Sequence, residues 1–402
     1  MTVTFKTFGC RLNRAETDRR MKALLQGGFD VLPFGSDSDV TVLHSCAVTH
    51  AAEAESLRLA AAVKRRNPGT FLVFSGCAAK AASHERLQRA GVDLVFSPGA
   101  EDDVALEILK RFPGAGGQGV AAPGTGLHRA LLKVQDGCSN FCTYCFVPIA
   151  RGLPRSRKME ECLQEAAWLI EAGYSEIVVV GCNLAFYEDG KMRLPDLLAA
   201  LVALPGNCRL RLSSLEPGFF EREVADLIAS EPKLCPFLHL PLQSGDDEVL
   251  KRMGRHYGVS YLRSMLDDVC AKLPLFGLGA DVIAGFPGET SAQFENTFSL
   301  INDYPFSNLH VFPYSKRPGT PAADFDGQIP DAEKKARSGR LIALRDGKKA
   351  EFTERHRGKK VEVVIERVDE NGIGQGWSAD YLQCSIPGCR PEDIGRMKDF
   401  IL

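Results

Sequence analysis

The sequence predicts an α/β protein with an open parallel N-terminal domain, a partial parallel (β/α)6 barrel and a small C-terminal β domain. Short β-rich runs alternate with amphipathic helical stretches over most of the 402 residues. A segment rich in glycine and proline interrupts this alternation at residues 112–126. From residue 360 the chain changes to β-rich runs around a glycine-rich turn. These three observations fix the fold class and the domain order.

The first domain, residues 1–111, contains four runs that favour strands, namely 3–8, 40–43, 71–74 and 93–96. Helical stretches separate them, which is the pattern of an open parallel sheet. Residues 112–126 contain six glycines and two prolines. Such a segment is too poor in apolar side chains to continue a helix or strand, so we expect a linker there.

The second domain, residues 127–355, repeats a β-like run followed by a helical stretch six times. The runs are 131–135, 176–180, 209–212, 237–240, 277–282 and 308–312. Six βα units predict a parallel barrel that falls two units short of a closed eight, and that therefore opens on one side to a large substrate. The remaining residues, 356–402, predict a small β domain with runs at 361–366 and 381–386 and a turn at 372–376.

Composition restricts the class of protein. A net charge of -2 produces no overall attraction for nucleic acid, so a polyanionic partner must meet local patches. Thirteen cysteines suggest a secreted disulfide protein, but the chain is large and lacks an apolar signal segment. No run approaches the ~20 apolar residues of a membrane span. We expect a soluble, cytoplasmic protein without a membrane partner.

Three cysteines stand close together as Cys138, Cys142 and Cys145, in a C-x3-C-x2-C pattern that we call the clasp. A 4Fe-4S cluster held by three thiolates keeps one iron open to a small molecule, whereas an electron-transfer cluster is normally closed by four. The clasp therefore indicates a catalytic cluster. A zinc knuckle is the alternative, but the pattern lacks paired-doublet spacing and no histidine follows at a ligand interval.

A second set of cysteines, which we call the dispersed triad, consists of Cys10, Cys46 and Cys77. Each follows a predicted strand, and the carboxyl ends of parallel strands converge on one crevice. Gly9 and Gly76 allow the backbone to approach an inorganic cluster. The alternative is three buried thiols that act as small apolar side chains. We expect the other cysteines to be core or incidental thiols: Cys162, Cys182, Cys208, Cys235, Cys270, Cys384 and Cys389.

Taken together, these motifs resemble the methylthiotransferase family of radical S-adenosylmethionine (SAM) enzymes along nearly the whole chain. The first domain resembles that family's auxiliary-cluster domain, the second its radical-SAM barrel and the third an RNA-binding TRAM domain. His44 and Ser45 depart from the usual Asn-Thr before the second cysteine. The match is carried by residues 7–13, 45–49, 133–138, 240–245, 281–290 and 312–320.

The resemblance implies two 4Fe-4S clusters, one on the clasp and one on the dispersed triad, with SAM as the co-substrate. One SAM would methylate a sulfur on the auxiliary cluster, and a second would yield a deoxyadenosyl radical. The implied electron donor is a protein such as flavodoxin or ferredoxin. Gly9–Asn13 and Lys133–Cys138 are most similar to the branch that modifies C2 of N6-threonylcarbamoyladenosine at tRNA position 37. Three alternatives stay open: an isopentenyladenosine tRNA substrate, a ribosomal-protein aspartate, and a non-catalytic Fe-S RNA-binding protein.

Several polar residues fall at the carboxyl ends of the predicted barrel strands, which form the functional face of a parallel barrel. Tyr144 is expected to pack on the adenine of SAM, although a core tyrosine is the competing interpretation. Serine and glutamine at strand ends are often simple caps. The expected SAM-binding residues are Tyr144, Gly181, Ser213, Ser214, Glu216, Gln243 and Asp281.

Two basic segments are candidates for RNA contact. Arg151, Arg155, Arg157 and Lys158 follow the clasp, where phosphate contacts would position the anticodon stem-loop. Residues 334–360 carry eleven Lys or Arg against three Asp or Glu. A solvated helix face is the alternative interpretation of such charge.

Overall fold

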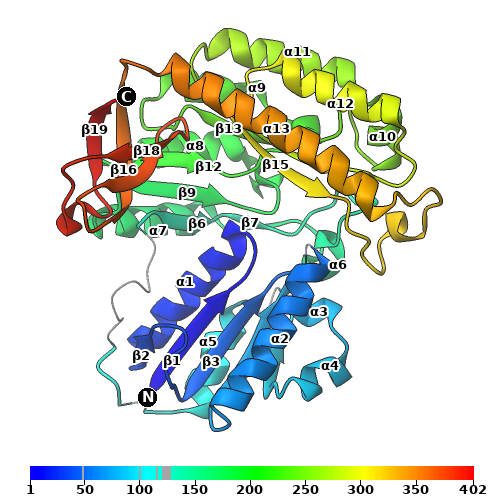
Figure 1. The fold of residues 1–402 in the computed structure, drawn as a ribbon. Helices are drawn as coiled ribbons and strands as arrows, with labels where there is room; N and C mark the ends of the chain where they lie inside the picture. Colours follow the sequence, from blue (N-terminus) through cyan, green and yellow to red (C-terminus); the bar gives the residue numbers. More distant parts are fainter. Residues whose placement is uncertain (48, 99–100, 115, 120–127) are drawn as a thin grey trace.

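A computed structural model describes all residues of the chain except 48, 99–100, 115 and 120–127 (Figure 1). The N-terminal domain lies below the barrel in this view, and the C-terminal β-sheet lies at one side of the barrel. The long helix α13 (Asp331–Arg355) runs across the barrel. The α/β fold class predicted from the sequence is confirmed.

The N-terminal domain is built on a five-stranded parallel sheet with the order β2-β1-β3-β4-β5. The strands are β1 (Thr2–Thr7), β2 (Asp30–Leu32), β3 (Val40–Ser45), β4 (Phe71–Gly76) and β5 (Leu94–Phe96). The central strand β3 is buried at all six residues, as expected for a strand covered on both faces. The sequence did not reveal β2, because three residues carry no periodic pattern.

Helices cover both faces of this sheet. They are α1 (Arg11–Gln26), α2 (His50–Arg66), α3 (Cys77–Ala81), α4 (His84–Arg89) and α5 (Glu101–Arg111). α1 and α5 pack on one face, where Leu24 and Ile108 join the strand valines. α2, α3 and α4 pack on the other, where Leu57 meets Leu43 and Phe74. The alternate side chains of each strand thus reach two separate cores.

The predicted linker lies partly outside the described residues, since 115 and 120–126 belong to the part that is not described. The described residues at the start of this segment pack on the N-terminal domain. Phe112 forms an edge contact with Phe71, with 5.5 Å between the ring centroids. The Gly117 amide donates to the carbonyl oxygen of Gly28 over 2.8 Å.

The barrel consists of two three-stranded parallel sheets with the orders β12-β9-β6 and β13-β14-β15. Isolated bridges, Leu210 to Leu234 and Ser214 to His239, connect them. The first predicted strand is broken at Val134 into two short strands. The strands of the two sheets are β6 (Ala130–Lys133), β9 (Glu176–Val180), β12 (Arg209–Leu212), β13 (Phe237–Gln243), β14 (Gly277–Ala284) and β15 (Asn308–Pro313), and the short β7 (Gln135–Asp136) after β6 belongs to neither sheet.

Helices surround the barrel, and short elements lie in its loops. The helices are α6 (Val147–Arg151), α7 (Met159–Glu171), α8 (Leu194–Val202), α9 (Arg222–Ser230), α10 (Asp247–Arg252), α11 (Val259–Lys272), α12 (Ser291–Asp303) and α13. The short strands are β8 (Arg155–Ser156), β10 (Glu188–Asp189) and β11 (Met192–Arg193). The 3-10 helices in these loops are η1 (Leu184–Phe186), η2 (Pro217–Phe219) and η3 (Pro321–Asp324), while η4 (Pro391–Asp393) lies in the C-terminal domain.

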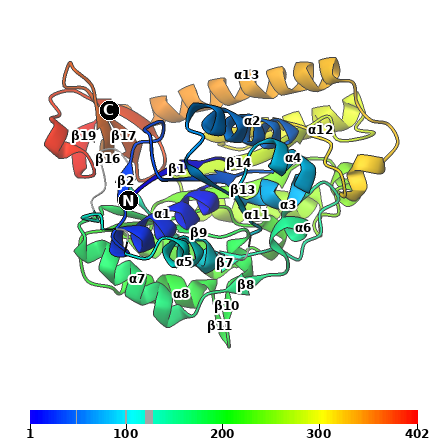
Figure 2. The same cartoon turned by 90° about the horizontal axis from the view of Figure 1, so that it is seen from below.

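The N-terminal domain packs against the barrel through α1, which contacts β6 and β9 (Figure 2). Leu12 and Ala15 of α1 form an apolar cluster with Val178 and Val180 of β9. A second contact joins α3 to α6, next to the clasp. Both cysteine sets therefore lie near the boundary between the two domains.

The C-terminal domain is a four-stranded antiparallel sheet with the order β18-β17-β16-β19. Its strands are β16 (Lys360–Val368), β17 (Gly374–Ser378), β18 (Gln383–Ile386) and β19 (Met397–Ile401). The expected turn at 372–376 is wrong in its second half, because strand β17 begins at Gly374. Cys384 and Cys389 lie in the core of this sheet with Val363 and Ile365, as expected for incidental thiols.

This sheet docks at the amino ends of the barrel strands through buried arginines. Arg209 and Arg211 both bind the fully buried Glu176, over 2.7 and 2.8 Å. Arg211 also donates to the carbonyl oxygen of Ser378, and Arg209 to that of Glu362. Although burial opposes it, the pairing with Arg211 and Arg209 lowers the pKa of Glu176. This end of a parallel barrel generally serves stability.

His356 joins α13 to the same sheet and predicts a pH-dependent stability. Its Nδ1 faces the Phe352 carbonyl oxygen and its Nε2 faces the Asp380 carboxylate, so the doubly protonated ring satisfies both acceptors. The hydrogen bond to Asp380 raises the pKa of His356 despite burial. The stabilisation is complete below the unfolded-state pKa of about 6.5 and is lost as pH rises through the raised folded value.

We expect the free energy of unfolding to fall between pH 6 and pH 9 through this residue, because the neutral ring can donate to only one of its two acceptors. Denaturant unfolding of the wild type and of His356→Gln at both pH values measures it. An equal pH dependence in the two proteins would contradict the assignment.

No helix in the described part of the chain is long and apolar enough to cross a membrane.

Candidate active site

The dispersed triad comes together at the carboxyl edge of the N-terminal sheet. Cys10 precedes α1, Cys46 follows β3, and Cys77 opens α3 directly after β4. Strands β1, β3 and β4 are neighbours, so their ends share one edge. The pKa of Cys77 is raised to about 11, chiefly by burial and also by the nearby thiols of Cys10 and Cys46. The three thiols therefore share one site.

Two glycines let the cysteine-bearing loops approach one another. Gly9 and Gly76 have φ values of 89° and 90°, a region that favours glycine. A Cβ on Gly9 would lie 2.6 Å from the Sγ of Cys46. A Cβ on Gly76 would lie 2.4 Å from the carbonyl oxygen of Ser45. A larger residue at either position would displace the loops that carry the thiols.

The clasp forms a tight loop between β7 and α6. The Cys145 amide donates to the Cys142 carbonyl oxygen over 2.9 Å, and the Cys138 amide donates to that of Gly152 over 3.1 Å. Phe141 adopts a positive φ of 47°, rare for a residue with a side chain, and this reverses the chain between the first two cysteines. Burial raises the pKa of Cys138 to about 11 and that of Cys145 to about 12.

Arg255 supports the clasp from the barrel. This buried side chain donates from Nη1 to the Sγ of Cys142 over 3.4 Å and to the Tyr144 hydroxyl over 3.3 Å. It also pairs with the Glu216 carboxylate at 2.6 Å. A guanidinium beside a thiolate favours the anionic sulfur that binds metal. The sequence did not reveal Arg255, because it belongs to no spaced motif and acts only through the fold.

The sulfur atoms of each cysteine set are too widely spaced for a single zinc ion in this structure. A tetrahedral zinc with zinc–sulfur bonds of about 2.3 Å holds its sulfurs roughly 3.8 Å apart. In the described part of the chain, neither cysteine set has three sulfur atoms that all lie within 4.8 Å of one another. Together with the glycine-lined approach and the arginine at Cys142, this donor set suits an iron–sulfur cluster.

A cavity of about 220 Å³ lies between the two cysteine sets. Cys77 of the dispersed triad and Cys145 of the clasp both line it. The remaining lining residues are Ala47, Thr49, Tyr144, Phe146, Val147, Ala150, Gln243, Asp281, Ile283, Phe312, Pro313, Tyr314 and Ser315. Its wall is mainly apolar with a few polar groups, as is usual for a small-molecule site.

The structure divides the expected SAM-binding residues into two groups. Tyr144, Gln243 and Asp281 line the cavity, so they can contact a molecule bound there. Glu216 instead pairs with Arg255, although burial raises its pKa. Burial also raises the pKa of Tyr144 well above its usual range, so the phenol stays neutral.

The other three expected residues do not line the cavity. The Ser213 hydroxyl is buried and has no hydrogen-bond partner among the described residues. Ser214 bridges to the backbone of His239, which is a structural contact. A Cβ on Gly181 would lie 3.0 Å from the Oε1 of Gln135, so glycine allows close packing there.

A buried charge network links the two domains beside the dispersed triad. Arg151 of the barrel binds Glu16 over 2.6 Å and Asp136 over 3.0 Å, and Glu16 also binds Lys133 over 2.9 Å. Although burial opposes it, the positive charges around Glu16, first that of Arg151, hold its pKa well below the usual range. His44 joins the network through a 2.7 Å contact with Glu16.

This network corrects one expectation. Arg151 was expected to contact RNA phosphate, but the residue is 3% exposed and its guanidinium is occupied by protein carboxylates. Its partner Glu16 lies over a hundred positions away in the sequence, so a local charge pattern cannot reveal the pair. Burial raises the pKa of Cys77, and the positive charge of Arg151 opposes part of that rise. Arg151 therefore lies beside the dispersed triad and supports it, instead of facing RNA.

The remaining basic residues after the clasp differ in exposure. Arg157 is mostly buried and binds Glu165 over 2.6 Å. The side chains of Arg155 and Lys158 are 56% and 73% exposed. In the run 334–360, several charges are paired within the protein, such as Arg337 with Glu289.

Two family models match the chain, the radical SAM superfamily over residues 132–301 and the uncharacterized protein family UPF0004 over residues 2–97. The threonylcarbamoyladenosine tRNA methylthiotransferase MtaB of Bacillus subtilis is 35% identical over 96% of this chain and 90% of its own length. The protein of the same name from Thermotoga maritima is 34% identical over 97% and 92%. The chain is a member of the radical-SAM methylthiotransferase family.

Other relatives of this methylthiotransferase are named for a different substrate. The tRNA-2-methylthio-N(6)-dimethylallyladenosine synthase of Arthrobacter sp. is 35% identical over 90% of this chain and 73% of its own length. Among solved structures, the radical SAM methyltransferase TsrM of Kitasatospora setae has a TM-score of 0.59 at 14% identity, over 80% of this chain and 75% of its own. That likeness shows the shared fold. The family assignment makes the protein a radical-SAM enzyme that uses an iron–sulfur cluster and SAM.

Proposed function

We propose that this protein adds a methylthio group to C2 of N6-threonylcarbamoyladenosine at position 37 of tRNA, using two SAM molecules and two 4Fe-4S clusters. The observation that carries this proposal is a cavity lined by both Cys77 and Cys145. A reaction that joins a sulfur to a carbon needs the sulfur source and the activating group to reach one substrate atom. The cavity offers such a place.

The clasp and the dispersed triad would each hold one cluster, and the bound clusters with SAM would supply a carbon radical and a methylated sulfur. An external one-electron donor such as flavodoxin or ferredoxin would drive the step. C2 of adenine carries an unactivated hydrogen, which no ordinary base or nucleophile of the chain can replace with sulfur. The apolar wall formed by Phe146, Ile283 and Phe312 would exclude water from the reactive intermediates.

Protein residues would position the reactants. Tyr144, with its hydroxyl held by Arg255, presents its ring to the cavity beside the clasp, where the adenine of SAM can pack. Gln243 lines the same cavity with a positive φ of 68°, which turns the chain at the end of β13. Its amide can bind the polar parts of SAM.

The substrate assignment is supported by the coverage of the relatives. The two named threonylcarbamoyladenosine enzymes align over at least 90% of both chains, whereas the Arthrobacter enzyme aligns over 73% of its own length. The exposed Arg155 and Lys158 would bind phosphates of the anticodon stem-loop, while the target base is splayed out into the cavity.

Incubation of cluster-reconstituted protein with SAM, reductant and defined tRNA tests this function. We expect a mass gain of one methylthio group, in place of hydrogen, only on tRNA that carries the threonylcarbamoyl group. The double variant Arg155→Ala/Lys158→Ala should raise KM for tRNA with little change in kcat. A product formed only on unmodified or isopentenylated tRNA would overturn the assignment.

A further inference from the structure

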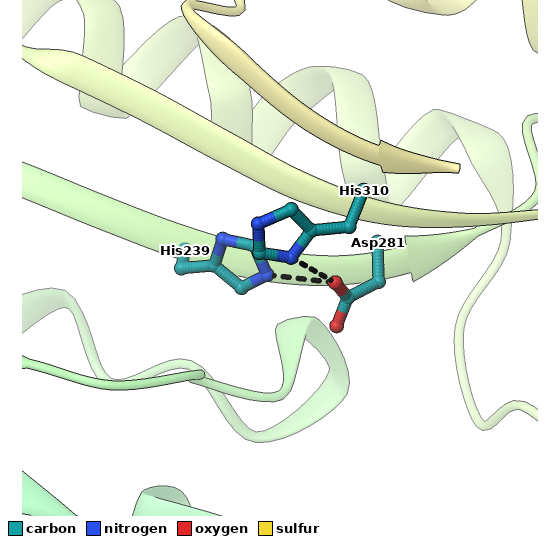
Figure 3. Close-up of side chains that lie close together, drawn as sticks. All are labelled: His239, Asp281 and His310. Carbon is teal, nitrogen blue, oxygen red and sulfur yellow. Dashed lines mark hydrogen bonds and ion pairs between the residues drawn. The ribbon is translucent and has the colours of Figure 1, made fainter. Parts of the chain in front are cut away.

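A group of three polar side chains lies inside the barrel next to the cavity, on the neighbouring strands β13, β14 and β15 (Figure 3). His239 Nε2 lies 3.0 Å from Oδ1 of Asp281, and His310 Nδ1 lies 3.1 Å from the same oxygen. One carboxylate thus holds two imidazole rings. The ring centroids are 4.9 Å apart with an interplanar angle of 38°.

The two histidines differ in their access to ligands. The side chain of His239 is 8% exposed, and a Cβ on Gly279 would lie 2.6 Å from its Nδ1, so this ring is enclosed. The side chain of His310 is 50% exposed. It lies two residues before the cavity-lining Phe312 and hence on the same face of β15. His310 therefore stands at the edge of the cavity, beside Asp281.

The carboxylate fixes the orientation of the exposed ring. Although burial opposes it, the hydrogen bonds from His239 and His310 hold the pKa of Asp281 well below its usual range, so it stays anionic. An anion at Nδ1 requires a proton there. Among the residues that the structure describes, no hydrogen bond reaches the Nε2 of His310, so this atom of a fixed ring can accept when the ring is neutral and donate when it is charged.

We propose that His310, oriented by Asp281, recognises the polar hydrogen-bonding substituent on N6 of the target adenine and so determines the choice of substrate. This inference rests on the proposed function. A threonylcarbamoyl group carries N–H, hydroxyl and carboxylate groups that can bind the free Nε2 in either protonation state. A dimethylallyl group carries none and would leave Nε2 desolvated without a partner.

General rules of specificity indicate how strongly such a histidine would discriminate between the two substrates. A site built to hydrogen-bond a polar group rejects an analogue that lacks it far more strongly than an apolar pocket rejects an extra methylene. Percentage identity does not separate the two substrates, since relatives named for either one reach 35% identity to this chain. A few residues at the cavity must therefore make the distinction.

Two imidazoles and a carboxylate are also a donor set that transition-metal ions accept, and here the three ligand atoms lie within 4.8 Å of one another. In this structure the Asp281 oxygen itself occupies the point on which both histidine nitrogens converge (Figure 3). The hydrogen bonds thus satisfy the inner nitrogens without a metal, and the outer Nε2 of His310 remains for a ligand.

The test compares reconstituted wild type and His310→Leu on matched tRNAs that carry the threonylcarbamoyl or the dimethylallyl group. We expect kcat/KM for the threonylcarbamoyl tRNA to fall at least tenfold in His310→Leu, with dimethylallyl tRNA unchanged or improved. Deoxyadenosine formation without tRNA should stay at the wild-type level, which reports intact clusters. His84→Leu, on the exposed surface of α4, is the matched control and should leave the ratio unchanged.

The outcomes separate the two proposals. A wild type that does not act on threonylcarbamoyl tRNA overturns the proposed function itself. An active wild type with an unchanged substrate ratio in His310→Leu overturns the role of His310. One zinc ion per chain in the reconstituted wild type, absent from His310→Leu by elemental analysis, would also overturn it, because the histidines would then be metal ligands.

Discussion

Replacing Cys77 with alanine should abolish methylthio transfer while SAM cleavage continues. Cys77 lies among the thiols of Cys10 and Cys46 and lines the cavity from the N-terminal domain, whereas the clasp lies in the barrel. If the dispersed triad holds its own cluster, its loss removes the sulfur source and leaves the radical source intact. Iron should fall from about eight to about four atoms per chain, the content of one 4Fe-4S cluster.

The matched replacement Cys145→Ala should give the opposite pattern. It should stop both deoxyadenosine formation and methylthio transfer, with about four irons retained on the dispersed triad. Cys270→Ala, in α11 and away from both cysteine sets, controls for the loss of a thiol. Iron analysis, deoxyadenosine assay and product mass measure the three proteins. Wild-type iron content in Cys77→Ala would contradict the two-cluster proposal.

Arg151→Met should destabilise the protein by about 3–5 kcal/mol, the usual cost of removing one partner from a buried ion pair. The arginine side chain is 2% exposed and neutralises Glu16 and Asp136, whose side chains are 1% and 6% exposed. Methionine fills similar volume but leaves both carboxylates without this positive charge. Because Glu16 belongs to the N-terminal domain and Arg151 to the barrel, the loss should weaken the contact between the domains.

Denaturant unfolding and limited proteolysis at the domain boundary measure this effect. The exposed Arg155 supplies the control, since its side chain lies 3.7 Å from Asp136 and Arg155→Ala should change stability by less than about 1 kcal/mol. Equal stability of the two variants would show that the network around Glu16 is not what holds the domains. Glu16→Gln in the Arg151→Met background should recover part of the loss, because it removes one of the two buried carboxylates that Arg151 neutralised.

The cysteine sets could be predicted from the sequence for two different physical reasons. The clasp is local, so its spacing alone shows that three thiols share a loop. The dispersed triad is not local, and its prediction depended on the rule that parallel strands end at one edge. That rule predicts the sheet edge at which the three cysteines lie, but it does not predict the distances between their sulfur atoms. The close approach of Gly9 to Cys46 became known only from the fold.

The site residues that were misassigned or missed in the sequence all depend on contacts between distant segments. A basic run has the same pattern whether it faces solvent or a buried carboxylate, so Arg151 could not be separated from Arg155 in advance. Arg255 carries no motif, yet it touches Cys142. Likewise His239 and His310 occur in ordinary strand sequences, and only the pairing of β13, β14 and β15 brings them to Asp281.

The buried network around Glu16 has a consequence for the evolution of the chain. Two halves that share buried ion pairs cannot be separated or exchanged freely, because separation would expose Glu16 on one side and its partners Arg151 and Lys133 on the other. A recombined chain would need compatible partners for Glu16, Arg151 and Asp136 at once. The N-terminal domain and the barrel are therefore expected to be inherited together, as one unit rather than as interchangeable parts.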